Sequence, residues 1–405
     1  MDFNDAPEEA AFRAEARAWL EANAQAVPTG GLGENAEAVA DEKRWQALKA
    51  DAGWACLTWP EEYGGRAASP MQNVIWNEEE SKYKASVNIF SIGQGMLGPT
   101  LMVHGTEEQK QRYLRPMLRG EEIWSQLFSE PGAGSDIAGL RTHCVRDGDD
   151  WITNGQKIWT SGAHYSDWGI LVARTDPNVV KHAGLSYFIV DMKAPGIEIR
   201  PIKQIDGGSG FNEVFFNDVR IPDSSRVGEI NDGWRCVITT LMNERSSLGM
   251  SLGGLGIDDL IELARETRWD GSAAIDDASV RRRLADYYIR LKGVQYTSYR
   301  SLTALSRGAT PGPEGSIGKL VSAPLRQEMA SFAVDLLGEA GVLRGDASAA
   351  RGAWQSAYLG APGIRLAGGT DEILRNIVAE RVLGLPPEMR ADKGMAFKEI
   401  PTGSL

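Results

Sequence analysis

Apolar residues in the first third of the chain are spaced for helices. Between residues 8 and 26, apolar side chains such as Phe12 and Leu20 recur every three to four positions, which places them on one face of an amphipathic helix. Residues 106–109 read Thr-Glu-Glu-Gln, a capping box in which the threonine and glutamine side chains each bond the other residue's backbone N–H. We expect the helix that it starts to run to about residue 120.

The middle third instead carries short apolar or alternating runs, which are typical of β-strands. We expect a hairpin over residues 151–159 with its turn at Asn154-Gly155, because this pair tolerates the positive φ of a type I′ turn. Several short strands at this spacing predict a small sheet or barrel. The further strands are predicted at residues 169–173, 185–192, 196–202 and 214–221.

Helical periodicity returns in the last third. The order helices, strands, helices predicts an α+β fold in which a β domain lies between two helical domains. Its predicted helices are residues 236–249, 278–306, 323–337 and 370–383. The expected domains are residues 1–124, 125–235 and 236–405.

The amino-acid composition excludes several classes of binding partner and of structural element. The 43 Lys and Arg against 55 Asp and Glu leave a net charge of −12, so the chain lacks the positive field that nucleic acids or anionic membranes attract. Its 3 cysteines have no CxxC spacing and its 4 histidines no metal-binding arrangement, which predicts neither a disulfide framework nor a metal site. No apolar run has the length of a membrane span or a signal peptide, so we expect a cytoplasmic protein.

Two short segments concentrate residues suited to ligand binding. Residues 129–136 read Ser-Glu-Pro-Gly-Ala-Gly-Ser-Asp, in which small residues allow close approach of a ligand and Ser129 and Ser135 offer hydroxyl groups. In residues 157–162, Trp159 stands next to hydroxyl-bearing residues, a combination that suits stacking and hydrogen bonding with a flat heteroaromatic ring. Taken singly, each segment is more often a surface turn or a core tryptophan.

Together these segments resemble the acyl-CoA dehydrogenase family along nearly the whole chain. The SEPGAGSD loop, the NGxKxWxSG segment and the Gly369-Thr370 pair that opens a helix occur in the family's order. The resemblance implies an N-terminal helical domain, a central β-barrel or sheet domain and a C-terminal four-helix bundle. It also implies FAD as cofactor, an acyl-CoA substrate, an electron-transferring flavoprotein as partner, and a homodimer or tetramer.

The resemblance further assigns individual residues to the cofactor. Ser129, with the Phe128 backbone, would bond the pyrimidine side of the flavin, Trp159 would pack against the ring, and the Ser161 hydroxyl would lie near N5. A helix N-terminus favours anions through its unpaired N–H groups, so the Gly369 segment would approach the FAD phosphates. The implied cofactor-binding set is Phe128, Ser129, Trp159, Ser161, Gly369, Thr370 and Glu372.

The catalytic base is the residue on which this sequence departs from the commonest family pattern. Many members place a Glu directly before the Gly-Thr pair, where this chain has Gly368, whose N–H can still bind the thioester carbonyl. A second arrangement, seen in isovaleryl-CoA and long-chain types, places the Glu on the first helix after the barrel. Glu244 stands there and is therefore our expected base, with Arg245 matching the family's arginine beside the thioester and Ser135 facing the CoA chain. An arbitrary Glu-Arg pair is usually a solvated ion pair, but the vacant first position favours catalysis.

Two alternative functions remain open, and one further feature bears on the acyl group. Residues 335–341 and 268–271 differ from the family segments that bind the adenine end of FAD across a subunit interface, so a subunit of a mixed tetramer, inactive without its partner, is one alternative. Another is a flavin monooxygenase or nitroalkane-oxidase-like enzyme on the same fold, although such relatives place Asp or His where Glu244 stands. Gly368 together with a helix-borne Glu opens space near the β carbon, which favours a branched or bulky acyl group.

Overall fold

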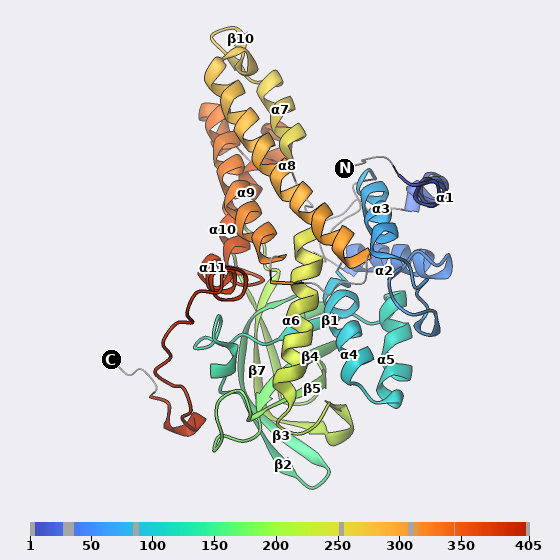
Figure 1. Cartoon of the computed structure of the whole chain (residues 1–405), viewed down its shortest axis with the longest axis vertical. Coiled ribbons are helices and arrows are strands. Elements are labelled where there is room, and N and C mark those ends of the chain that lie inside the picture. Colours follow the sequence, from blue (N-terminus) through green and yellow to red (C-terminus); the bar gives the residue numbers. More distant parts are fainter. Residues whose placement is uncertain are drawn as a thin grey trace. The chain divides into compact units, whose positions relative to one another are not determined.

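The computed structural model describes residues 5–26, 36–83, 89–250, 255–306, 312–313, 315–343 and 345–401, and of residues 24, 245–250, 302, 305 and 346 the backbone alone. The chain divides into two compact units (Figure 1). The first comprises residues up to 203, residues 209–244 and residues from 389 onward; the second comprises residues 204–208 and 245–388. Among the described residues, no helix combines the length and apolar character that crossing a membrane requires.

Helices of the first unit pack around a cluster of tryptophans. The rings of Trp54 and Trp76 stack at 4.6 Å, and Trp19 lies against both, at 6.1 and 5.9 Å. The predicted capping box is confirmed, because the Gln109 N–H donates to Thr106 Oγ1 at 3.2 Å and Gln109 Oε1 accepts from the Thr106 N–H at 3.1 Å. The helices around this cluster are α1 (Pro7–Asn23), α2 (Ala36–Asp51) and α3 (Pro70–Ser81), and they are followed in the chain by α4 (Gly98–His104) and α5 (Glu107–Arg119).

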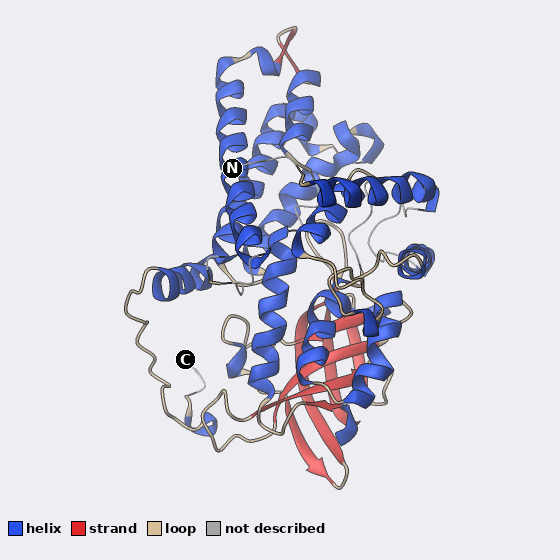
Figure 2. Cartoon of the chain, turned by 45° about the vertical axis from the view of Figure 1, so that its right-hand side comes forward, coloured by secondary structure: helices blue, strands red, loops and turns tan. Residues whose placement is uncertain are grey.

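The strands of the first unit form one sheet, drawn in red in Figure 2. Its order is β6-β7-β3-β2-β4-β5-β8, and β1 pairs with β4 in parallel. The four strands predicted after residue 168 are confirmed as β4 to β7. The strands are β1 (Trp124–Leu127), β2 (His143–Asp147), β3 (Asp150–Ser161), β4 (Trp168–Arg174), β5 (Leu185–Asp191), β6 (Ile197–Ile202), β7 (Phe211–Pro222) and β8 (Arg226–Val227).

One face of this sheet is covered by α4, α5 and α6 (Gly233–Met250), as Figure 1 shows. Buried residues of α5 such as Leu114 meet Ile170 of β4 and Val237 of α6 in one core cluster. Because β4 and β5 are buried on both faces, they read as continuous apolar runs rather than as alternating ones. The sheet thus fixes α6, the helix that carries Glu244.

The predicted turn at Asn154-Gly155 is wrong, since both residues lie inside β3. The turn between β2 and β3 is Gly148-Asp149, with Asp147 paired to Asp150. Asn154 instead exchanges side-chain and backbone hydrogen bonds with Asp218 of β7, both at 2.9 Å. A Cβ on Gly155 would stand 2.4 Å from the Thr142 hydroxyl oxygen, so this glycine permits close strand packing rather than a reversal.

The second unit is a helical bundle built on α9 (Gly315–Leu337), which contacts every other long helix of the unit. Leu325 and Phe332 of α9 share a buried core with Tyr287 of α8 and Trp354 of α10. The remaining elements are α7 (Ile257–Glu266), α8 (Ala278–Ser306), α10 (Ala353–Leu366), α11 (Asp371–Ile377) and the strand pair β9 (Arg268–Trp269) and β10 (Ser272–Ala273). The predicted α+β arrangement, with a sheet between helical regions, is confirmed.

Candidate active site

The two ligand-binding segments predicted from the sequence are joined in the structure. The Ile158 N–H donates to the Ser129 carbonyl at 2.9 Å, which links the loop after β1 to β3. The Lys157 ammonium, whose side chain is 0% exposed, donates to the Phe128 carbonyl at 3.0 Å and to Glu130 Oε1 at 2.8 Å. The loop that carries Ser129 and the strand that carries Trp159 and Ser161 therefore form one connected piece.

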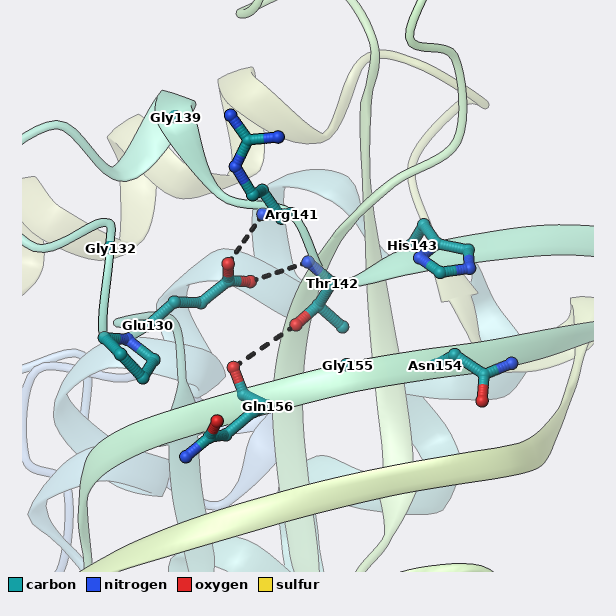
Figure 3. Close-up of a pocket in the computed structure, with 10 residues that line it drawn as sticks. Glu130, Gly132, Gly139, Arg141, Thr142, His143, Asn154, Gly155 and Gln156 are labelled. Atoms are coloured by element: carbon teal, nitrogen blue, oxygen red, sulfur yellow. Dashed lines mark hydrogen bonds between the residues drawn. The ribbon is translucent and has the colours of Figure 1, made fainter. Parts of the chain in front are cut away.

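The carboxylate of Glu130 is the centre of this connection. Besides Lys157, it accepts the backbone N–H groups of Arg141 at 2.6 Å and Thr142 at 2.9 Å (Figure 3). Burial by itself would raise the pKa of Glu130, but the Lys157 charge and these hydrogen bonds outweigh it and keep the pKa below its usual value. Burial lowers the pKa of Lys157, against the opposing attraction of Glu130. The pair is a hydrogen-bonded ion pair inside the sheet domain.

Trp159 lies in a strained backbone conformation with its ring turned to the outside. The pairing of β3 with β7 shifts register between Lys157 and Thr160, so that Trp159 occupies a bulge with a φ of 59°. Its side chain is 57% exposed, and one edge of the indole meets the Phe211 ring at 6.0 Å. A large aromatic residue with positive φ is rare and is held only where the surrounding structure enforces it.

The strain at Trp159 makes a testable prediction about two variants. The unfolding free energy of the Trp159→Gly variant is expected to be about 1 kcal/mol higher than that of Trp159→Ala, because glycine accepts positive φ and alanine does not. Denaturant unfolding of both variants measures the difference. In an ordinary strand the order is reversed, so an alanine variant at least as stable as the glycine variant would show that the bulge relaxes without the indole.

Glu244 lies on the buried face of α6. One turn before it, the Thr240 hydroxyl contacts the Tyr187 hydroxyl at 3.0 Å and the Thr100 hydroxyl at 2.9 Å, which seats α6 on β5 and α4. The Tyr187 ring in turn meets the Phe128 ring edge-on at 6.0 Å. Glu244 follows Thr240 by four positions, the spacing of one helix face, and is 9% exposed. Glu244 is thus a buried carboxylate at the end of the α6 segment that belongs to the same unit as Ser129 and Trp159.

The residues predicted to surround the substrate differ in exposure, and not all of their side chains are described. Ser135 is exposed near the end of the loop, next to Asp136, whose carboxylate bonds Lys181 at 2.7 Å. Arg245 continues α6, but its side chain lies outside the described residues. Phe128, the residue directly after β1, buries its ring against Tyr187 of β5.

Gly368, Gly369 and Thr370 belong to the second unit. As predicted, Thr370 caps a helix, and its hydroxyl accepts the Ile373 N–H at 3.3 Å at the start of α11. Gly368 and Gly369 have φ of 64° and 98°, and the Gly369 carbonyl accepts from Lys319 Nζ of α9 at 2.5 Å. Glu372 is exposed in the first turn.

A hollow of about 390 Å³ lies beside Glu130 and next to residues 154–156 of β3 (Figure 3). Arg141 and His143 are exposed at its wall, and the Thr142 hydroxyl donates to the Gln156 carbonyl at 3.4 Å. None of the residues predicted from the sequence to contact cofactor or substrate lines it. The hollow therefore adjoins the candidate site and is not part of it.

The comparison with known families decides the identity of this arrangement. Models of the acyl-CoA dehydrogenase N-terminal, middle and C-terminal domains match residues 6–121, 125–219 and 231–383. The chain belongs to the acyl-CoA dehydrogenase family. It is accordingly an oxidoreductase of the class that acts on the CH–CH bond of an acyl-CoA, and the family consists of flavoproteins.

Individual acyl-CoA dehydrogenases resemble the chain over nearly its full length. Acyl-CoA dehydrogenase IpdE1 of Mycobacterium tuberculosis is 40% identical over 387 residues, 94% of this chain and 98% of the relative. A solved structure described as the Tcur3481-Tcur3483 steroid ACAD has a TM-score of 0.82 at 30% identity, covering 96% of this chain and 100% of that one. The ChsE4-ChsE5 complex from Mycobacterium tuberculosis gives 0.79 at 30% identity, with the same coverage of both chains.

Sequence reasoning missed the roles of Lys157 and Glu130, although both residues lie inside the motifs it used. The available signal was the alternation along β3, where Trp151, Thr153 and Lys157 all occupy buried positions of one parity. A lysine at an inward position of a strand indicates a buried charge that requires a partner. Its partner lies 27 residues earlier, beyond the reach of local pattern analysis.

Proposed function

We propose that this acyl-CoA dehydrogenase uses FAD to convert a bulky, ring-bearing acyl-CoA thioester to the trans-2-enoyl-CoA. The observation that carries the proposal is Glu244, a buried carboxylate on the inner face of α6 in the unit that holds Ser129 and Trp159. A buried carboxylate is suited to take a proton from carbon, because bulk water would otherwise hydrate the carboxylate and make it a weaker base.

The residues around Trp159 fit a flavin ring. An indole that is 57% exposed, beside the exposed Ser161 and the half-buried Ser129, offers an aromatic face and hydroxyl groups on a rigid base. FAD, when bound, supplies the acceptor for the hydrogen that leaves the β carbon. Phe128, Ser129, Trp159 and Ser161 would hold the ring, and Gly369, Thr370 and Glu372 belong to the segment that would meet the phosphates.

The chain's own residues provide the acid–base part of the reaction. Glu244 takes the α-proton of the thioester, and the backbone N–H of Gly368 stabilises the negative charge that develops on the thioester oxygen. Arg245 is the next residue in the chain after the base, and it would lie beside the thioester. Ser135, exposed on its loop, contacts the CoA chain.

Two observations support a bulky acyl group. Gly368, in the position where many family members carry the base, has no side chain, so the acyl group is less confined there. A relative of TM-score 0.82 is described as a steroid ACAD, which is a property of that protein and favours a fused-ring substrate for this one.

The same relatives support a proposal about the assembly. Both solved structures compared above are described by the names of two different chains. We infer that this chain forms a dimer or tetramer that includes a second acyl-CoA dehydrogenase-like chain, and that electrons pass to an electron-transferring flavoprotein.

Anaerobic mixing with straight-chain, branched and ring-bearing acyl-CoAs tests the function. We expect ring-bearing thioesters to bleach the visible flavin absorbance and straight short chains to do so at least tenfold more slowly. A protein that only short straight thioesters bleach would remove the proposed substrate class. A yellow protein that no thioester bleaches, but that consumes oxygen with another substrate, would favour an oxidase or monooxygenase. A colourless, folded protein that becomes yellow on co-expression with a related chain would support the mixed assembly.

A further inference from the structure

The reaction proposed above leaves the fully buried Lys157 without a role. Taking an ammonium group out of water costs several kcal/mol, and replacing a buried ion pair by apolar residues is often neutral or stabilising. Stability alone therefore does not explain a lysine at this position. What a lysine does here, and an apolar residue cannot, is to bond the Phe128 carbonyl at 3.0 Å and the Glu130 carboxylate at 2.8 Å at the same time.

The position of Lys157 in β3 gives these contacts a geometric consequence. It is the last residue in register with β7 before the bulge, being paired with Val214. After the bulge, pairing resumes at Thr160, whose carbonyl accepts the Asn212 side chain at 3.0 Å. Trp159 is thus held from both sides, by the Lys157 anchor before it and the Asn212 contact after it. Releasing one side removes the restraint that enforces its positive φ.

We propose that Lys157 is a positioning residue for the flavin, because it fixes the distance between the Ser129 loop and the indole of Trp159. This inference rests on the proposed function, since the two segments are those that would contact the ring. The Glu130 carboxylate, bonded to two backbone N–H groups, anchors the far end of the loop to the same ammonium. One buried cation therefore sets the spacing of the whole ring-binding surface.

Two substitutions separate positioning from stability. Lys157→Met removes the cation but leaves Glu130 as an unpaired buried charge, so the melting temperature falls. Adding Glu130→Gln removes that charge, and the double variant is expected to recover most of the melting temperature. Lys49→Met is the matched control, because the Lys49 ammonium is also buried and bonds Glu80 at 2.9 Å, among the N-terminal helices.

The readouts are flavin affinity, visible circular dichroism of the bound flavin, and melting temperature. We expect the double variant to bind FAD at least tenfold more weakly than the unaltered chain, with an altered dichroism spectrum. The FAD affinity of Lys49→Met should stay within twofold of the unaltered chain, however much its melting temperature changes. A double variant with unchanged affinity and spectrum would show that Lys157 is only structural.

Hydrogen exchange distinguishes this inference from the proposed function. Measured without flavin, the backbone amides of residues 128–134 and 158–161 should exchange faster in the double variant and at the original rate in Lys49→Met. That result supports the role of Lys157 even if the unaltered chain binds no FAD, an outcome that would instead refute the proposed function. Unchanged exchange in the double variant overturns the inference by itself.

Discussion

Glu244→Gln is expected to slow dehydrogenation by about 10³-fold, the scale on which a general base contributes to catalysis. The substitution preserves the size of a side chain that is only 9% exposed but removes the carboxylate proposed to take the α-proton. Flavin should remain bound, because Glu244 is not among the residues assigned to the ring. Stopped-flow measurement of flavin bleaching by a ring-bearing acyl-CoA, without oxygen, gives the rate directly.

A second position on the same helix provides the control. Arg235 is exposed on α6 and bonds the Asp232 carboxylate at 3.0 Å, so Arg235→Gln changes the charge of the helix without touching the buried face. Its bleaching rate should stay within twofold of the unaltered protein. If Glu244→Gln bleaches as fast as Arg235→Gln, the base is another residue.

Acid is expected to weaken the N-terminal helices through Glu79. This carboxylate is 1% exposed and accepts from Arg13, Arg17 and Lys82 at 3.1, 3.1 and 2.6 Å. The hydrogen bond from Arg17, with those from Lys82 and Arg13, outweighs burial and lowers the pKa of Glu79 from 4.5 to about 2. The stabilisation is therefore complete above about pH 4.5 and is lost as pH falls from there toward about 2.

Glu79→Gln should accordingly lower the unfolding free energy at pH 7 by about 2 to 3 kcal/mol, and by much less near pH 2. Tryptophan fluorescence during denaturant unfolding measures this loss, and its signal includes Trp76 of the tryptophan cluster, which lies on the same helix. Glu78→Gln is the comparison, because Glu78 also bonds Arg13, at 2.9 Å, but is 41% exposed. Equal losses at pH 7 for the two variants would contradict the assignment to a buried carboxylate.

Local patterns predicted those parts of the fold that depend on neighbouring residues. The capping box at Thr106 needs only its own first turn, and the strands of the middle third show their apolar runs directly. By contrast, α9 begins at Gly315 rather than near Ala323, and it continues through Pro324, a residue type that is more common at a helix start. The turn predicted at Asn154-Gly155 was wrong for a related reason, since the contact that requires glycine comes from Thr142, which precedes β2 and is 13 positions away in the chain.

The candidate site shows the same limit. Trp159 was identified from its neighbours, but its positive φ depends on the register of β7, which no local pattern encodes. Glu244 was assigned by family likeness, and helix periodicity places it on the inner face of α6 once Thr240 is seen to be buried there. The cofactor and substrate roles of both residues remain predictions.

The bulge at Trp159 also bears on the order in which the protein folds. β3 spans Asp150–Ser161 and its partner β7 spans Phe211–Pro222, so the pairing closes a loop of some 50 residues or more, a non-local step that forms slowly. The turn between β2 and β3 closes first. Trp159 acquires its conformation only when Asn212 and Val214 of β7 have paired with β3, so a chain still on the ribosome cannot complete the bulge until Val214 has emerged.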